Sequence, residues 1–304
     1  MTDTSFPASR FLSPRYWPLW IGFGITWSLA RLPYAWLMRA GRMLGRLLLA
    51  LPGHRRHVAS VNLALCFPEL TDAQRYDLLR RHFESLGMGM MEIVLSWWAS
   101  PARLRPLAHV EGVEHLDMAL NEGRGVILLM AHFTTVEIAT TLLAMRVPLY
   151  ATYRPHNNAL FEEVMRRARQ RHGSVIDHGN IRAMLRALKN NKAVWYSPDQ
   201  DYSGNHSVFV PFFGVSAATM TATAELARLG NASVIPIFPE RLPGDQGYRI
   251  TLQPALENFP SGDAEKDTAR INALFEAQVR LIPEQYLWVH RRFKSRPTGS
   301  KGVY

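Results

Sequence analysis

The sequence has little cysteine and lacks any disulfide framework. Its 304 residues contain one cysteine, Cys66, so no disulfide can form within the chain. This cysteine follows Leu65 and precedes Phe67 and Pro68, with no histidine or acid beside it. We therefore interpret it as a packed side chain, and the low cysteine content as favouring a domain that faces the cytosol.

Several common enzyme motifs are also missing from the sequence. It has no P-loop or dinucleotide fingerprint, and no H-x-x-x-H, C-x-x-C or H-E-x-x-H spacing that predicts a metal site. It has no G-x-S-x-G elbow to supply a serine nucleophile. No linker, repeat or charge block divides the chain. We expect one large domain that uses neither cofactor nor metal and forms no acyl-enzyme.

Acidic residues are outnumbered, which gives the chain a formal net charge of +10. A basic balance favours anionic partners: nucleic acid, lipid headgroups, lipid phosphates or an acidic carrier protein. Tryptophan and tyrosine near the N-terminal apolar run favour a membrane among these. Nucleic acid is disfavoured, because the basic residues are dispersed and no nucleic-acid module is present.

Residues 16–38 form an apolar run that only Arg31 interrupts. A bilayer core requires about 20 apolar residues of helix, and Arg31 lies where its side chain could reach the headgroups. More arginines follow the run than precede it, which places the bulk of the chain in the cytoplasm. We predict a cap over 1–15, a transmembrane or membrane-anchoring helix over 16–38, and a cytoplasmic-facing domain over 39–304. A helix lying on the membrane and a buried core helix are the alternatives.

Beyond this run, short apolar segments alternate with amphipathic ones. The continuous apolar run 125–131 predicts a strand buried on both faces. Further strands are expected at 148–153, 193–197, 233–238 and 248–252, and helices at 72–98, 134–145, 158–172, 180–190, 217–229 and 263–281. This alternation predicts an α/β fold: a mostly parallel central sheet with helices on both faces.

A histidine and a glutamate flank the point where a predicted strand gives way to a helix. His132 follows the run 125–131, and Glu137 falls in the first turn of the helix. Five residues on one helix would separate the side chains by about 140°, so they can meet only if a turn intervenes. Such a pair can take a proton from a hydroxyl that then attacks a carbonyl. Two structural alternatives stay open: Thr134 and Glu137 also form a capping box, and His132 could be a core histidine.

Polar segments follow two other predicted strands, at the sheet edge where ligands bind in such folds. Arg154 and Asn158 precede a basic helix, whose arginines could face the cleft, bind phosphates or form a solvated surface. Asp199 and Asp201 follow the strand at 193–197. These two carboxylates could bind a metal, orient a substrate or cap a loop.

The chain resembles the late acyltransferases of lipid A biosynthesis, lauroyl branch, within the glycerolipid and lysophospholipid acyltransferase superfamily. The resemblance covers almost the whole chain. It is carried by residues 15–17 with the apolar run, 62–68, 83–89, 132–137, 153–155 with Asn158, 195–201, 209–214 and 284–293. The histidine–glutamate element alone is common, whereas the ensemble of segments is highly specific.

The resemblance implies a role for each candidate residue. His132 would be the general base with Glu137 as its partner, and Arg169, eleven residues beyond Asn158, would bind or polarise the acyl carbonyl. The candidate substrate-binding residues are Arg169, Arg154, Asn158, Asp199 and Asp201. Gln200 departs from the family pattern and leaves the role of the 199–201 loop open.

The resemblance also implies the substrates and the location. The donor would be an acyl–acyl carrier protein, and the acceptor a hydroxyacyl 3-hydroxyl of the Kdo-bearing lipid IVA precursor. The enzyme would lie at the inner membrane, single-pass or monotopic, with its site on the cytoplasmic side. Another glycerolipid or lysophospholipid acyltransferase, and a non-catalytic membrane or nucleic-acid binder, are the alternative functions.

Overall fold

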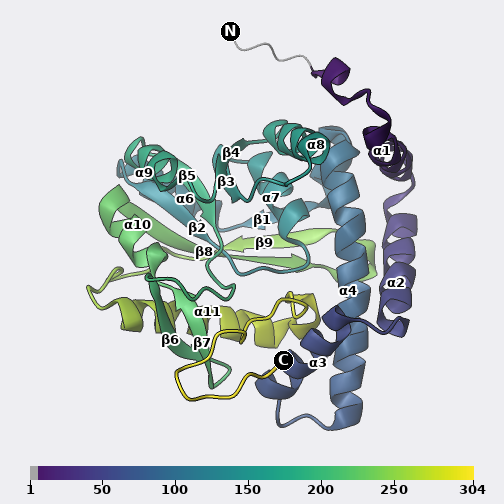
Figure 1. Ribbon diagram of the computed structural model, residues 1–304. Coiled ribbons are helices and arrows are strands. Elements are labelled where there is room, and N and C mark those ends of the chain that lie inside the picture. Colours follow the sequence, from purple (N-terminus) through teal and green to yellow (C-terminus); the bar gives the residue numbers. More distant parts are fainter. Residues whose placement is uncertain (1–5) are drawn as a thin grey trace.

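A computed structural model describes residues 6–304, and a seven-stranded sheet forms its centre (Figure 1). The strands are β1 (Ala108–Glu111), β2 (Gly125–Leu129), β3 (Leu149–Tyr153), β4 (Ser174–Asp177), β5 (Ala193–Tyr196), β8 (Ala232–Arg241) and β9 (Tyr248–Leu252). Their order is β1-β9-β8-β2-β5-β3-β4, and every neighbouring pair is parallel except β8 with β9. The predicted α/β fold with a mostly parallel sheet is confirmed.

The central strand β2 is buried on both faces, as its unbroken apolar sequence predicts. Val126 and Leu128 join the hydrophobic cluster on one face, and Ile127 and Leu129 join the cluster on the other. The first face is covered by α6 (Val113–Asn121) and α7 (Val136–Ala144), and the second by α9 (Ile181–Lys189), α10 (Ala222–Gly230) and α11 (Ala264–Leu281). Helices therefore lie on both faces, and α8 (Ala159–Gln170) packs beside β4.

The longest helix, α4 (Asp72–Trp98), has the predicted bounds and runs along one side of the sheet (Figure 1). Thr71 and Gln74 form a capping box at its start. It packs closely on α2 (Tyr34–Ala50), because glycines stand at the contact: a Cβ on Gly45 would lie 2.0 Å from the Phe83 carbonyl oxygen. Short helices α3 (His54–Cys66) and α5 (Pro101–Leu104) flank α4 in the sequence.

The N-terminal apolar run differs from its prediction. It forms two helices, α1 (Trp17–Leu29) and α2, because Pro33 adopts an extended backbone and disfavours helix in the residue before it. The predicted single helix over 16–38 is therefore wrong, and the boundary placed after Met38 falls inside α2. Across residues 6–304, none of the helices is both long enough and apolar enough to span a bilayer.

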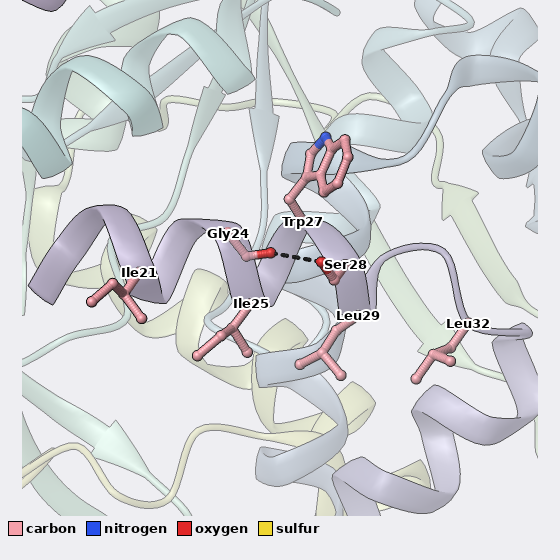
Figure 2. Close-up of a pocket in the computed structure, with 7 residues that line it drawn as sticks. All are labelled: Ile21, Gly24, Ile25, Trp27, Ser28, Leu29 and Leu32. Carbon is pink, nitrogen blue, oxygen red and sulfur yellow. Dashed lines mark hydrogen bonds between the residues drawn. The ribbon is translucent and has the colours of Figure 1, made fainter. Parts of the chain in front are cut away.

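Helix α1 nevertheless presents an apolar surface to solvent. Figure 2 shows Ile21, Ile25 and Leu29 on the same side of the helix, lining a hollow of about 610 Å³. Ile21 and Ile25 expose 65% and 56% of their surface. The opposite side of α1 packs on the protein, where the Phe23 ring meets those of Trp98 and Phe161. Apolar side chains so strongly exposed mark a site of contact with another apolar surface.

One predicted helix is partly wrong. Residues 217–220 belong to a hairpin of β6 (Ser207–Phe212) and β7 (Val215–Met220), and α10 begins only at Ala222. Phe213 and Gly214 both have positive φ at the hairpin turn, with Gly214 at 71°. The alanine-rich sequence favours a helix locally, but strand pairing and packing against α11 override that preference.

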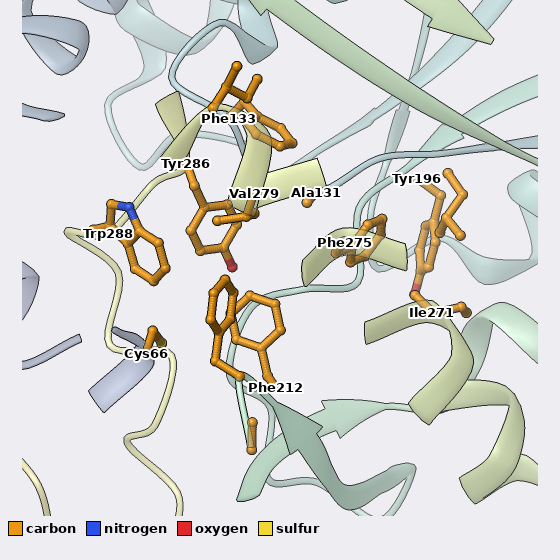
Figure 3. Packing of buried hydrophobic residues seen from close by; sticks show 14 of the residues in the cluster. Cys66, Ala131, Phe133, Tyr196, Phe212, Ile271, Phe275, Val279, Tyr286 and Trp288 are labelled. Atoms are coloured by element: carbon orange, nitrogen blue, oxygen red, sulfur yellow. The ribbon is translucent and has the colours of Figure 1, made fainter. Parts of the chain in front are cut away.

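The C-terminal segment 284–293 is buried against the β6–β7 hairpin and α3 (Figure 3). The Tyr286 and Trp288 rings lie 4.8 Å apart, and Trp288 also packs on Phe67. Cys66 belongs to the same cluster, where burial raises the pKa of its thiol. The prediction that Cys66 is a packed side chain is confirmed.

Candidate active site

His132 lies in the turn between the end of β2 at Leu129 and the start of α7 at Val136. The C-terminal segment fixes this turn through backbone hydrogen bonds. The Leu287 amide donates to the His132 carbonyl at 3.0 Å, and the Thr134 amide donates to the Gln285 carbonyl at 2.7 Å. The ring of His132 is therefore carried on a backbone that segments distant in sequence hold in place.

The partner of the His132 ring is Asp199, which follows β5. Nδ1 of His132 lies 2.6 Å from one carboxylate oxygen, and the His132 amide donates to the other at 2.9 Å. The Tyr286 hydroxyl donates to that second oxygen at 3.1 Å. Because the carboxylate is an acceptor, neutral His132 carries its proton on Nδ1 and leaves the Nε2 lone pair free. Asp199 is 2% exposed, so it can act only through these contacts.

The electrostatics of this pair favour a charged carboxylate and a basic imidazole. Burial alone would lower the pKa of His132, but the charge and hydrogen bond of Asp199 outweigh it and raise that pKa. Burial alone would raise the pKa of Asp199, but His132 outweighs it and lowers that pKa. Burial and the Asp199 charge raise the pKa of Tyr286 well above its usual range, so its hydroxyl stays a donor.

Glu137 does not bond the His132 ring, and that predicted contact is wrong. Its carboxylate accepts hydrogen bonds from Nε and a terminal nitrogen of Arg169, at 2.9 and 2.6 Å. Nε1 of Trp97 donates to the same carboxylate at 3.0 Å. The two side chains point in different directions. Glu137, in the first turn of α7, points toward α8 and the end of α4, whereas His132, in the preceding turn, points toward the residue that follows β5.

The capping-box alternative for Thr134 and Glu137 is also wrong, since Thr135 is the N-cap of α7 and makes no side-chain capping bond. The Thr134 hydroxyl instead lies 2.7 Å from that of Ser85 on α4. A Cβ on Gly89 would lie 2.6 Å from the Thr134 carbonyl oxygen, so glycine is needed for α4 to approach the turn. The turn is thus supported by α4 on one side and by the C-terminal segment on the other.

A buried ion pair lies behind this support. Arg241 of β8 bonds to Glu92 on α4, and donates to the Ser85 hydroxyl at 2.8 Å. The Tyr248 hydroxyl donates to Glu92 at 2.9 Å. Because both charged side chains are buried, removing either would leave the other without its opposite charge in the protein interior.

The structure gives the other candidate residues different positions. Asn158 caps α8 by accepting from the Leu160 and Phe161 amides, each at 3.1 Å. Asp201 accepts from the Ser295 amide and hydroxyl at 2.9 and 3.0 Å, so it ties the 199–201 loop to the C-terminal segment. Arg154 lines the same cavity as His132. The two aspartates therefore face different partners, and substrate binding by these residues stays a prediction.

His132, Glu137 and Arg169 all line one cavity of about 930 Å³. Its apolar lining falls into two groups on either side of the sheet edge. The first group comes from α7, β3 and α8: Val136, Ala144, Leu149, Ala151 and Met165. The second group comes from β7, α9 and α10: Met220, Ile181, Ala222, Leu226 and Leu229. The cavity can therefore hold long apolar chains beside a polar wall.

Sequence analysis missed two residues of the site, Trp97 and Tyr286. Neither is near His132 or Glu137 in the sequence, and each reaches the site through tertiary packing. Tyr286 does lie in the segment 284–293, which carries part of the family resemblance. That segment was the available signal that the C-terminal residues contribute to the site.

An imidazole with one nitrogen fixed by a carboxylate, in the wall of an apolar cavity, can deprotonate a hydroxyl for attack on an acyl carbonyl. Comparison with known proteins agrees with this chemistry. The family model described as bacterial lipid A biosynthesis acyltransferase matches residues 7–295. The protein is therefore an acyltransferase.

Individual relatives identify the family. The lipid A biosynthesis lauroyltransferase of Escherichia coli K12 is 38% identical over 306 residues, covering 100% of both chains. The lipid A biosynthesis palmitoleoyltransferase of the same organism is 38% identical over 297 residues, covering 97% of each. The chain belongs to the bacterial lipid A biosynthesis acyltransferase family, and the resemblance seen in its sequence is confirmed.

Among the solved structures that align with this chain is the 1-acyl-sn-glycerophosphate acyltransferase PlsC of Thermotoga maritima, with 15% identity over 81% of this chain and 99% of that one. The TM-score of this alignment is 0.36.

Proposed function

We propose that this protein transfers a lauroyl chain from acyl carrier protein to a hydroxyacyl 3-hydroxyl of the Kdo-bearing lipid IVA precursor. The observation that carries the proposal is the His132–Asp199 pair in the wall of a cavity with two apolar linings. Membership of the lipid A acyltransferase family supports the class of substrates. The full-length match to a lauroyltransferase supports a lauroyl group, and the palmitoleoyltransferase of equal identity makes palmitoleoyl the competing acyl group.

The reaction uses His132 as general base. Nε2 takes the proton of the acceptor hydroxyl as its oxygen attacks the thioester carbonyl. The tetrahedral intermediate collapses, breaks the carbon–sulfur bond and expels the thiolate. The thiolate takes the proton back from the imidazolium, so the products are an ester and a free thiol. Asp199 stabilises the imidazolium and keeps the ring in the productive tautomer.

Glu137 acts on Arg169 rather than on His132 in this proposal. Two nitrogens of the Arg169 guanidinium bond to Glu137, which leaves further N–H donors on the cavity wall. These donors stabilise the developing oxyanion or bind a phosphate of the acceptor. Arg154, which also lines the cavity, adds a second positive charge for the phosphorylated acceptor.

The transferred chain occupies the apolar lining between α7, β3 and α8. Val136 and Ala144 lie eight residues apart on the cavity side of α7, which is about 12 Å of helix. A Cβ on Gly173 would lie 3.3 Å from that of Ala144, so the lining narrows at this end. This end of the cavity, away from His132, would receive the last carbons of the chain.

The protein attaches to the cytoplasmic face of the inner membrane through α1 and α2. The exposed apolar side chains of α1 support this, together with Trp36, Met43 and Leu47 on α2. Arginines on α2, among them Arg39, suit the anionic headgroups beside such a surface. Ile21→Glu combined with Ile25→Glu should move the protein from the membrane pellet to the supernatant, and sedimentation equal to wild type would contradict attachment through α1.

The experiment that tests the function is an in vitro assay with acyl carrier protein thioesters of several lengths and the lipid IVA precursor. Mass spectrometry of the product should show one added lauroyl ester with wild type and none with His132→Ala. Lysophosphatidate serves as the competing acceptor. Acylation of lysophosphatidate in preference to the lipid A precursor would overturn the proposed acceptor, and transfer by His132→Ala at the wild-type rate would overturn the mechanism.

A further inference from the structure

A cluster of basic side chains covers α9 and α10. Its five members are Arg182, Arg186 and Lys189 on α9, Lys192 just after it, and Arg228 on α10. All five are exposed, and within residues 6–304 none makes an ion pair or a side-chain hydrogen bond. We call these residues the α9–α10 basic patch.

Three arginines on other helices differ from these five, because an acid on the same helix compensates the charge of each. Arg80 lies 2.6 Å from Asp77, Arg166 lies 2.8 Å from Glu163, and Arg280 lies 2.8 Å from Glu276. Helix α9 contains no acid, and the one acid of α10, Glu225, lies 4.0 Å from His206. The patch therefore keeps a positive field that attracts anionic partners.

The patch adjoins the cavity that contains His132. Ile181 at the start of α9 and Leu229 on α10 line that cavity, and they are also 45% and 40% exposed. Lys189 is eight residues along α9 from Ile181, which corresponds to about 12 Å. A partner bound on the patch could therefore deliver a tethered group into the cavity past these two apolar side chains.

The position of the patch distinguishes a protein partner from a membrane. Helices α9 and α10 lie at the edge of the molecule opposite α1 and α2 (Figure 1). Contact of α1 and α2 with a bilayer would leave α9 and α10 turned away from it. A basic rim around exposed apolar side chains suits the surface of an acidic protein.

We propose that the α9–α10 basic patch docks the acidic carrier protein that brings the acyl thioester. This inference rests on the proposed function and adds the surface through which the donor binds. The carrier sits on the basic side chains, and its thioester arm enters the cavity past Ile181 and Leu229. The lipid acceptor approaches from the membrane-facing side, so donor and acceptor do not compete for one entrance.

The experiment compares wild type, Arg186→Glu/Lys189→Glu and the control Arg105→Glu/Lys266→Glu, which has the same change in charge. The two control residues are exposed and lie outside the patch and the cavity lining. Fluorescence anisotropy gives the Kd of labelled acyl carrier protein for each full-length enzyme. We expect the patch variant to bind about tenfold more weakly and the control to match wild type. The difference should shrink as salt is raised, because the charges are exposed.

Steady-state kinetics with two donors complete the test. The patch variant should raise KM for the carrier thioester and leave turnover of an acyl-pantetheine thioester unchanged. Equal carrier affinity in all three proteins would overturn the docking proposal. Loss of binding to phosphatidylglycerol vesicles with unchanged carrier affinity would overturn it too, and assign the patch to the membrane. If the wild-type enzyme fails to acylate the lipid precursor from either donor, that result would contradict the proposed function itself.

Discussion

Two pairs of oppositely charged or acid–base side chains contribute to the cavity lining, His132 with Asp199 behind it and Glu137 with Arg169, and they differ in how many hydrogen-bonding groups remain free. The Asp199 carboxylate is enclosed and fully engaged, because the His132 ring, the His132 amide and Tyr286 all bond to it. Glu137 and Arg169 are more exposed, with side-chain exposures of 13% and 25%, and the guanidinium keeps unused donors. The first pair sets the properties of one imidazole, whereas the second holds a positive charge where a substrate can reach it.

This difference separates two roles that one carboxylate cannot combine. A carboxylate that raises the pKa of a base must stay ionised, buried and fixed. Its burial is tolerated only because its oxygens accept hydrogen bonds from the protein. A carboxylate that holds an arginine for substrate must leave the arginine partly accessible. The enzyme places the two carboxylates on different elements, one after β5 and one on α7.

Loss of the base and loss of the carboxylate that orients it should have the largest effects. His132→Ala should lower kcat/KM by about 10²- to 10⁴-fold, because the imidazole that takes the hydroxyl proton is lost. His178→Ala is the matched control, since His178 also lines the cavity but has no carboxylate partner among residues 6–304. A comparable loss in both variants would show that the His132–Asp199 pair has no special role.

Removing the charge of Asp199 should act through His132 alone. Asp199→Asn should lower kcat/KM by about 10²- to 10⁴-fold, since the imidazolium loses its stabilising charge. The wild-type rate should rise with pH through a His132 pKa above about 6.5, because only the neutral ring is a base. In Asp199→Asn the acid limb of the pH–rate profile should move to lower pH. An unmoved acid limb would contradict the assignment of that limb to His132.

The Glu137–Arg169 pair should show a smaller effect and no change in pH dependence. We expect Glu137→Gln and Arg169→Gln each to lower kcat/KM by about 10- to 100-fold, by loosening an oriented cation. A double-mutant cycle should show that the two losses overlap strongly, since each change disrupts the same contact. Additive losses would contradict the Glu137–Arg169 contact. A shift of the acid limb of the pH–rate profile in Glu137→Gln would indicate that Glu137 acts on His132 instead.

The smallest effect is expected from a substitution that leaves both pairs intact and changes only the apolar lining of the cavity. Ala144→Leu should shorten the preferred acyl chain, with kcat/KM falling about fourfold for each methylene that the leucine displaces. Met220→Ala, in the second apolar lining, is the control and should leave chain preference unchanged. Competition between carrier thioesters of different lengths measures both. An unchanged preference in Ala144→Leu would place the transferred chain elsewhere.

The parts of the fold predicted from sequence are those set by local pattern. The unbroken apolar run of β2 and the capped amphipathic helix α4 could be recognised without knowledge of the tertiary structure. The β6–β7 hairpin could not, because pairing overrides its helix-favouring alanines. Pro33 marks the break in the sequence, but the prediction of one helix rested on the length of the apolar run and on Arg31 and did not consider this proline.

The sequence named four candidate residues that the structure brings near one another, His132, Glu137, Asp199 and Arg169, but the pairing of His132 with Glu137 was wrong. His132 bonds to Asp199, and Glu137 bonds to Arg169. The spacing of His132 and Glu137 gives their separation along the chain but not the direction in which each side chain leaves its turn. Asp199 is 67 residues from His132, and only the neighbouring positions of β2 and β5 bring them together.

The turn that carries His132 is held from behind by residues 285–287 and by α4, which are separated by nearly two hundred positions of chain. Contacts so distant in sequence form late when a protein folds, after local helices and neighbouring strands. On refolding from denaturant, far-ultraviolet signals should therefore recover before acyl transfer does. Activity in this enzyme thus reports completed folding, and a partly folded chain in the cell would consume no donor.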